Sequence, residues 1–311
     1  MFSIFDLHCD TAGEMLARGQ ALTDNVLAVS LKRANAYRAY TQVMAIWTHH
    51  RLSDEDGWEK MKQIYSSLLA DPAIREGRAT VCRSAPPREG RNLLLSIEDA
   101  RILNGRIDRV DELWELGFRL LTPLWCGKTC IGGSHDTSEG LTDFGKTAIK
   151  KACERGMILD ISHASEQSAD QILEIAADAS RPVIASHSNA YRICPVSRNL
   201  RDRQIDAIVE SGGVIGINLF KKFLRIDGEA SVDDVLRQVE YFLEKGAENA
   251  LALGCDMDGA DLPKDLSDLA ALEHLGNTLL RFYSEQTVHA ILYENAYLFA
   301  ERCLPSPCQQ P

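Results

Sequence analysis

Eight short runs of aliphatic and β-branched residues recur along the chain, and segments of helical length separate most of them. Runs that are apolar at every position are typical of buried parallel strands, because half-exposed antiparallel strands alternate apolar and polar side chains. Eight strand–loop–helix units in 311 residues predict an α/β fold, a (β/α)8 TIM barrel. A doubly wound sheet would usually carry a glycine-rich phosphate turn after its first strand, and this sequence has none. The predicted strands are residues 4–7, 42–47, 92–97, 118–122, 157–161, 182–186, 213–217 and 250–255.

The segments between these runs have the apolar spacing of amphipathic helices. Thr142 and Ser165 can cap two of them at the start, and Gly117 and Gly156 can end others. No linker divides the chain, so residues 1–304 are expected to form a single barrel domain and residues 305–311 a flexible tail. The predicted helices are residues 54–70, 107–116, 143–155, 165–177, 202–210 and 232–245.

Charge and cysteine usage limit the partners and the compartment. A net charge of -11 without a basic cluster argues against nucleic acid or an anionic membrane as the partner, which leaves small molecules. The chain shows no signal-peptide pattern and no stretch of 18 apolar residues. Its nine cysteines are scattered, so we expect a reducing, cytoplasmic location. Barrels of this kind often pair, and a homodimer is compatible with the sequence.

Metal-competent side chains follow five of the eight predicted strands. In a barrel, the carboxyl ends of all strands meet at one face, the face on which active sites are built. A single histidine or carboxylate there is usually a hydrogen-bonded structural residue. Buried polar groups are costly, however, and so many of them in one place indicate a purpose. The six side chains are His8, Asp10, Glu98, His163, His187 and Asp256.

The number of candidate ligands favours two metal ions over one. Three imidazoles and two carboxylates, those of His8, Asp10, Glu98, His163 and His187, are too many for one catalytic zinc that keeps a position open. Two metals bridged by a carboxylate would lower the pKa of a shared water toward about 7 and polarise a neighbouring carbonyl or phosphoryl group. The chemistry expected from this pattern is hydrolysis. The remaining histidines are predicted to lie mostly on the surface, at His49, His50, His135, His274 and His289.

Six short motifs occur in an order that resembles the membrane (renal) dipeptidase family, the M19 metallopeptidases, in its shorter bacterial form. The resemblance extends from about residue 4 to residue 300 and implies a barrel-type, dinuclear zinc dipeptidase. It implies that His8, Asp10 and Glu98 bind one zinc, that Glu98 bridges to the second, and that His163 and His187 complete the second site. The motifs are DLHCDT (6–11), SIED (96–99), LDISHAS (159–165), ASHSNAY (185–191), SRN (197–199) and CDMDG (255–259).

The resemblance also implies a mechanism and a substrate. A metal-bridging hydroxide would attack the peptide carbonyl of a dipeptide, and Glu98 and Asp256 would be the catalytic residues, with Asp256 handling protons. Arg198 would pair with the free C-terminal carboxylate, which suits the forked geometry of a guanidinium. Zinc is the expected metal, although imidazole and carboxylate ligands also suit other divalent ions such as manganese or iron.

Two positions depart from the family pattern, both in the substrate pocket. Trp125 stands where the family has a substrate-binding histidine, and an indole donates one hydrogen bond but carries no proton. Phe223 replaces a tyrosine that contacts the substrate carboxylate, and His135, on the loop of Trp125, is a candidate substitute for the missing histidine. Trp125 is therefore predicted to contact the substrate, and the substrate to be a dipeptide or a related amide.

These departures leave two further hypotheses open. The barrel and its metals could hydrolyse a different bond, in an amide, a lactone or a phosphoester, because the fold does not select the substrate. Alternatively, the loss of the histidine at Trp125 could mark a barrel that only binds a ligand. Dependence of turnover on a free substrate carboxylate and on Arg198 would separate these hypotheses from dipeptidase activity.

Overall fold

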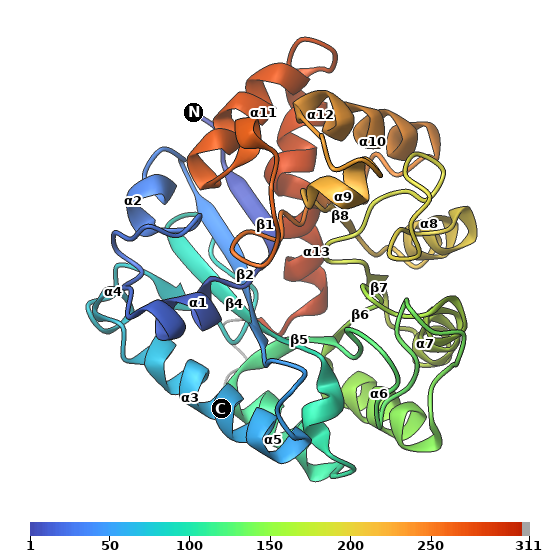
Figure 1. Ribbon diagram of the computed structural model, residues 1–311. Helices are drawn as coiled ribbons and strands as arrows, with labels where there is room; N and C mark the ends of the chain where they lie inside the picture. Colours follow the sequence, from blue (N-terminus) through green and yellow to red (C-terminus); the bar gives the residue numbers. More distant parts are fainter. Residues whose placement is uncertain (307–311) are drawn as a thin grey trace.

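Parallel strands lie edge to edge in the centre of the molecule, and helices surround them (Figure 1). The computed structural model describes residues 1–306, and residues 307–311 of the predicted tail lie outside that range. Around the barrel the strand order is β1, β2, β4, β5, β6, β7, β8, β9, and a parallel bridge between Ala185 and Ile215 joins β7 to β8. The ring closes, and the prediction of a (β/α)8 barrel is confirmed.

The bounds of the elements follow. The strands are β1 (Ile4–Cys9), β2 (Tyr40–Trp47), β3 (Thr80–Val81), β4 (Arg91–Glu98), β5 (Phe118–Thr122), β6 (Ile158–Asp160), β7 (Val183–Ile184), β8 (Ile215–Ile217) and β9 (Leu251–Leu253). The helices are α1 (Thr11–Arg18), α2 (Leu31–Ala34), α3 (Asp54–Leu69), α4 (Pro72–Arg75), α5 (Asp108–Leu116), α6 (Asp143–Arg155), α7 (Glu166–Asp178), α8 (Asp202–Glu210), α9 (Lys221–Leu224), α10 (Val232–Glu244), α11 (Leu272–Leu279), α12 (Glu285–His289) and α13 (Asn295–Cys303).

Local signals place the predicted helices within a residue or two. Thr142 accepts a hydrogen bond from the Gly145 amide and starts α6, and Ser165 caps α7 in the same way. Gly117 and Gly156 end α5 and α6 in the left-handed conformation that glycine adopts at little cost. Several elements were not predicted from the sequence, namely β3, α1, α2, α4, α9 and the helices that follow β9.

Strands β6 and β7 are shorter than predicted. β6 and β7 contain three and two residues, whereas runs of five were expected. The reason is visible at Asp160, whose Oδ1 accepts the backbone N–H groups of Ser162 and Ser186 at 2.9 Å. Because these N–H groups donate to a side chain and not to a neighbouring strand, the strand pairing ends early and the chain turns toward the barrel mouth.

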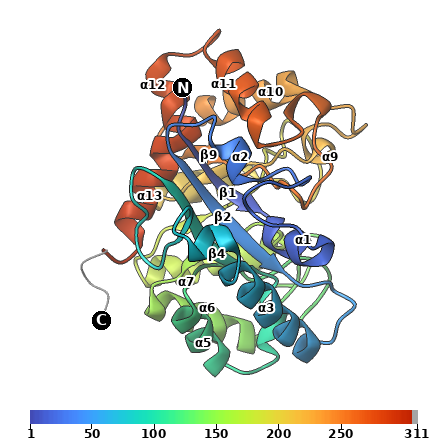
Figure 2. The same ribbon diagram turned by 90° about the vertical axis from the view of Figure 1, so that its left-hand side faces the viewer.

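The C-terminal helix, α13, closes the amino-terminal end of the barrel. Apolar side chains that point into the barrel, including Phe5, Val43 and Leu94, pack in one cluster with Tyr297 and Phe299 of α13. In Figure 2, α13 lies on the opposite side of the strands from α1, which begins directly after β1. With one end sealed by this helix, the opposite end is left for the site. Among the helices of the described part, none combines the length and apolar composition that a bilayer crossing requires.

Two glycines bring β8 and β9 against the end of β7. A Cβ atom on Gly216 or on Gly254 would overlap the carbonyl oxygen of Ser186. Backbone atoms cannot move aside as cheaply as the end of a flexible side chain, so these positions need glycine. The close approach sets the position of the residue after Ser186, which is His187.

Replacing Gly216 with alanine should lower the free energy of unfolding by about 3 kcal/mol, because the added methyl group meets fixed backbone. Gly13→Ala is the matched control: Gly13 is within α1 and a Cβ there has no neighbour within 4 Å. That variant should be stabilised by about 0.5–1 kcal/mol. Chemical denaturation measures both, and equal stabilities of the two variants would contradict the packing argument.

Candidate metal centre

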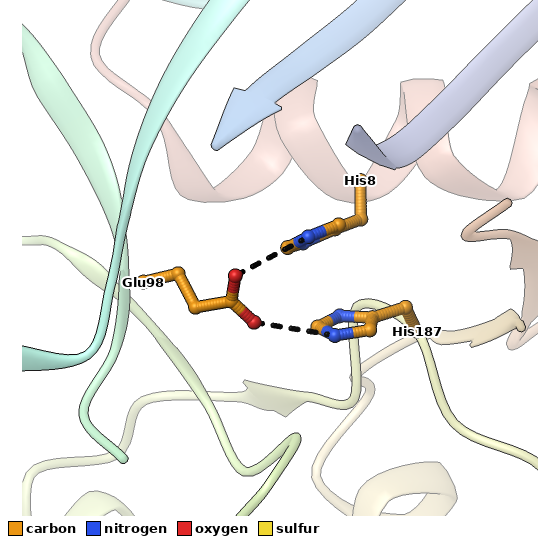
Figure 3. Close-up of side chains that lie close together, drawn as sticks. All are labelled: His8, Glu98 and His187. Atoms are coloured by element: carbon orange, nitrogen blue, oxygen red, sulfur yellow. Dashed lines mark ion pairs between the residues drawn. The ribbon is translucent and has the colours of Figure 1, made fainter. Parts of the chain in front are cut away.

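The Glu98 carboxylate, at the end of β4, faces the imidazoles of His8 and His187, which lie beside each other across the centre from it (Figure 3). Its Oε2 is 3.6 Å from Nε2 of His8, and its Oε1 is 3.4 Å from Nε2 of His187 and 3.1 Å from Nε2 of His163. The two oxygens thus face two different sets of nitrogen atoms. Glu98, His8 and His187 are all buried.

Two aspartates complete the group on the side of His8. The Oδ2 atom of Asp10 is 3.3 Å from Nε2 of His8, and Oδ1 of Asp256 is 3.9 Å from the same nitrogen. Asp10 directly follows β1, and a bridge between Cys9 and Met257 holds it beside the loop of Asp256. The structure therefore brings together all six side chains that follow the predicted strands.

Hydrogen bonds on the far side of two imidazole rings determine which nitrogen carries the proton. His163 Nδ1 faces the carbonyl oxygen of Trp125 at 3.1 Å, and a carbonyl only accepts. Ser186 donates its hydroxyl proton to Asp160, so it accepts from Nδ1 of His187 at 2.7 Å. Both rings therefore present an unprotonated Nε2 to the centre, and these atoms are 3.0 Å apart. Burial lowers the pKa of both histidines well below the usual value, which keeps them neutral.

This donor set fits metal binding. Two bare imidazole nitrogens 3.0 Å apart repel each other unless a cation lies between them and the neighbouring carboxylate. Ligand atoms about 2.0–2.2 Å from a tetrahedral ion lie about 3.3–3.5 Å from one another. The distances of 3.1–3.6 Å from the imidazole nitrogens to the Asp10 and Glu98 oxygens are close to that spacing, and the two imidazole nitrogens at 3.0 Å are slightly closer.

The carboxylates near His8 stabilise a positive charge on its imidazole. Burial opposes charge on this imidazole, but Glu98, Asp10 and Asp256 outweigh burial and raise the pKa of His8 to about 10. Burial, together with repulsion from Asp10, raises the pKa of Glu98 and of Asp256. A bound metal ion would relieve the same repulsion that a proton relieves here.

Backbone strain is concentrated at the same end of the barrel. His163 and Asp256, each just after its strand, have φ angles of 67° and 60°, and Asp99 and Asp258 are also left-handed. Non-glycine residues adopt this region at a cost of about 1–3 kcal/mol, and they persist there when the surrounding structure holds them. Asp258 is held by its carboxylate, which accepts from Thr11 Oγ1 at 2.6 Å and from the Ala28 amide at 2.7 Å.

Arg198 is buried beside the centre without a carboxylate partner. Its Nη atoms donate to Ser188 Oγ at 2.8 Å and to the carbonyl oxygen of His187 at 2.9 Å. Its Nε has no hydrogen-bond partner, and within residues 1–306 no carboxylate forms an ion pair with it. Burial lowers the pKa of Arg198 to about 10, so the side chain keeps its charge at neutral pH. The Phe223 ring faces the guanidinium, 5.6 Å from its carbon.

Trp125 is part of an aromatic wall and does not occupy the metal centre. Its ring stacks on His50 with centroids 5.4 Å apart and packs against Trp47 at 4.8 Å. A cavity of about 650 Å³ extends from Glu98 and His163 to this wall. His49 and His50 are exposed, as predicted, but they belong to the wall.

The prediction that grouped His135 with the surface histidines needs correction, and its position beside His163 agrees with its choice as a candidate substitute for the missing histidine. His135 is half-buried, its ring centroid is 5.9 Å from that of His163, and its Nδ1 is 3.0 Å from Ser197 Oγ. The cause is a backbone hydrogen bond from the His135 amide to the His163 carbonyl, which draws a distant loop to the centre. His274 and His289 are exposed, as predicted.

Two supporting residues were missed by the sequence analysis. Asn218 donates to Asp256 Oδ2 at 3.0 Å and to the carbonyl oxygen of His187 at 3.2 Å. It directly follows β8, so the rule that selected the other strand-end residues would have found it. Asp160, which orients His187 through Ser186, is the last residue of β6 but lay inside the longer predicted strand 157–161, so it carried no comparable signal.

Imidazoles and carboxylates gathered at the carboxyl ends of barrel strands define a metal-dependent hydrolase of the TIM-barrel class. The model of the membrane dipeptidase family, peptidase family M19, matches residues 1–300. The chain belongs to this family, and it is an enzyme that acts on peptide bonds. The resemblance inferred from the six motifs is confirmed.

Individual relatives agree with this assignment. An uncharacterised protein of the pqqA 5′ region of Klebsiella pneumoniae is 34% identical over 257 residues, which are 76% of this chain and 92% of the relative. The crystal structure of a dipeptidase AC, a metallopeptidase of family M19, superposes with a TM-score of 0.89 at 25% identity, covering 98% of this chain and 99% of that one. A metallopeptidase from Rhodobacter sphaeroides, liganded with a phosphinate mimic of L-Ala-D-Ala, has the same TM-score and identity, with coverage of 97% and 99%.

Removing the hydroxyl of Ser186 should weaken metal binding. In Ser186→Ala, Nδ1 of His187 loses its partner, and loss of such an orienting contact typically costs about 10- to 100-fold in metal affinity. Competition with a chromogenic chelator measures the Zn²⁺ affinity. Ser96→Ala is the matched control, because the Ser96 hydroxyl is buried without a hydrogen-bond partner in the described residues. Equal affinities in the two variants would refute the orienting role.

Proposed function

We propose that this enzyme hydrolyses dipeptides with a free C-terminal carboxylate and that it uses two Zn²⁺ ions. His8, Asp10 and Glu98 would hold one ion, and Glu98, His163 and His187 the other. The observation that carries this proposal is the position of Glu98, whose Oε2 faces His8 while its Oε1 faces the other two imidazoles. A carboxylate with its oxygens divided in this way is suited to bridge two ions.

The buried guanidinium of Arg198 supports a substrate with a carboxylate. An unpaired charge in a protein interior costs several kcal/mol, and a carboxylate from the substrate would compensate it. The free Nε–H and the fixed Nη groups offer the fork that carboxylates match. A neutral lactone requires no such group, so this residue favours a substrate with a free carboxylate over a lactone.

Two ions bound here would lower the pKa of a water molecule and polarise the peptide carbonyl. Asp256 would move the proton, and its surroundings support this role: Asn218 donates to its Oδ2, and its Oδ1 faces the centre, 3.9 Å from His8 Nε2. Burial and the neighbouring Asp10 raise the pKa of Asp256, which suits a group that accepts a proton and delivers it to the leaving amine. Trp125 would contact the substrate at the opposite wall.

The purified enzyme, stripped by chelation and reloaded with Zn²⁺, should hydrolyse members of a panel of L,L- and L,D-dipeptides. We expect no turnover in the stripped protein, recovery at two equivalents of Zn²⁺, and loss of activity in His163→Ala. Amine release and metal content are measured on the same samples. Two bound ions with no dipeptide turnover would contradict the dipeptidase assignment and favour another amide, lactone or phosphoester. Absence of stoichiometric metal binding would favour a barrel that only binds a ligand.

Arg198→Met should lower kcat/KM for free dipeptides by at least about 30-fold, because a buried charge pair contributes about 2–5 kcal/mol. The wild-type enzyme should reject the same dipeptides with an amidated C-terminus, and the variant should lose this discrimination. Arg198→Lys keeps the charge without the fork and should recover activity in part. If both variants retain the wild-type preference for free acids, the carboxylate is bound elsewhere.

A further inference from the structure

The cavity beside the metal centre is larger than a small dipeptide needs. Its volume of about 650 Å³ is within the range of about 300–1,000 Å³ that drug-sized ligands occupy. It continues from Glu98 past the metal centre toward α1, β2 and α3. Apolar side chains dominate this extension, namely Ala17, Trp47, Leu52, Ile64 and Trp125.

The order of strands indicates which half of the substrate this extension receives. In a closed ring of β1, β2, β4, β5, β6, β7, β8 and β9, the strand across from β2 is β7. Arg198 is anchored on Ser188 and His187, which follow β7, whereas Trp47 is the last residue of β2. A dipeptide with its carboxylate at Arg198 and its peptide carbonyl at the centre therefore directs its amino-terminal residue toward Trp47.

The aromatic wall at this end is preorganised. Trp47 and Trp125 pack with centroids 4.8 Å apart and an interplanar angle of 55°, and the rings of His49 and His50 brace them from the solvent side. Rings already held by one another lose little freedom on binding, and tilted or edge-to-face contact suits a further aromatic ring. Ile64 of α3 is buried and adds an aliphatic surface to the same cavity.

Charged side chains at this end are few. Glu14 is paired with Arg18 through Oε2 and Nε at 2.6 Å. Lys60 lines the cavity, half-buried, and forms no ion pair with any residue of the described chain. Lys60 is one cation beside the five apolar side chains of this extension, so the lining favours an uncharged group.

We propose that the amino-terminal residue of the substrate carries a bulky apolar side chain, aromatic in the first instance, that packs on Trp47 and Trp125. This inference rests on the proposed function, because it takes Arg198 as the anchor of the carboxylate. Trp125 then acts as a specificity residue, because its indole provides surface for the substrate side chain.

The test compares Ala-Gly, Leu-Gly, Phe-Gly and Glu-Gly as substrates of the zinc-loaded enzyme. Burying a benzyl group in place of a methyl group should raise kcat/KM for Phe-Gly at least about tenfold above that for Ala-Gly. Trp47→Ala and Trp125→Ala should bring this ratio near one. Trp114→Ala is the control, because Trp114 packs on Arg119 of β5 and does not line the cavity, and this variant should keep the wild-type ratio.

A binding measurement makes the outcome independent of turnover. Two phosphinate pseudo-dipeptides that differ only in a methyl or a benzyl group at the amino-terminal position are titrated by calorimetry. The benzyl compound should bind at least about tenfold more tightly to the wild type and lose this advantage in Trp47→Ala, with folding checked by circular dichroism.

The results separate the two proposals. Hydrolysis of all four dipeptides at similar kcat/KM, with equal affinity for the two phosphinates, would overturn the inference and leave the dipeptidase assignment intact. A preference for the benzyl compound without hydrolysis of any dipeptide would support the pocket and contradict the proposed function. A preference for Glu-Gly that disappears in Lys60→Met would overturn the inference in favour of an acidic side chain.

Discussion

The contact of the buried Glu98 carboxylate with three imidazoles, one through Oε2 and two through Oε1, is the interaction on which the rest of the site depends. Three imidazole rings and two further carboxylates lie within a few ångströms of one another. Without a cation this arrangement is unstable, because unprotonated nitrogen atoms and carboxylate oxygen atoms repel one another. Hydrogen bonds at Nδ1 nevertheless fix the rings of His163 and His187, and a left-handed backbone conformation orients His163. Metal binding explains why the protein holds these groups in fixed positions, and the membership of the chain in a metallopeptidase family agrees with it.

The barrel supports this centre through contacts far from the chemistry. Gly216 and Gly254 let two strands press on the Ser186 carbonyl, which places His187 where its ring stacks on His8 at 3.7 Å. At the other end, α13 seals the barrel and leaves only the carboxyl ends of the strands open. Stability and site geometry are therefore coupled, since the same close approach of β7 to β8 closes the ring and positions a proposed ligand.

In our proposal, the residues that select the substrate and the residues that hold the metal ions come from different parts of the barrel mouth. The proposed metal ligands come from β1, β4 and the ends of β6 and β7, whereas the apolar wall comes from β2, α3 and the loop after β5. Residues of this wall such as Trp125 can change while the donor set stays whole. A family of enzymes can vary its substrates in this way while it keeps one hydrolytic centre.

The sequence by itself determined the class of fold, because continuous apolar runs and helical periodicity are local properties, and it determined the family through six ordered motifs. It also marked His8, Asp10, Glu98, His163, His187 and Asp256, since each follows or ends a predicted strand. Only the tertiary structure decided the remainder. Four features join residues that are distant in the chain. They are the closure of the barrel end by α13, the burial of Arg198 without an ion-pair partner among the described residues, the proximity of His135 to His163, and the wall of Trp47 and Trp125. Such contacts depend on how the ring of strands closes, and no local pattern of residues records that closure.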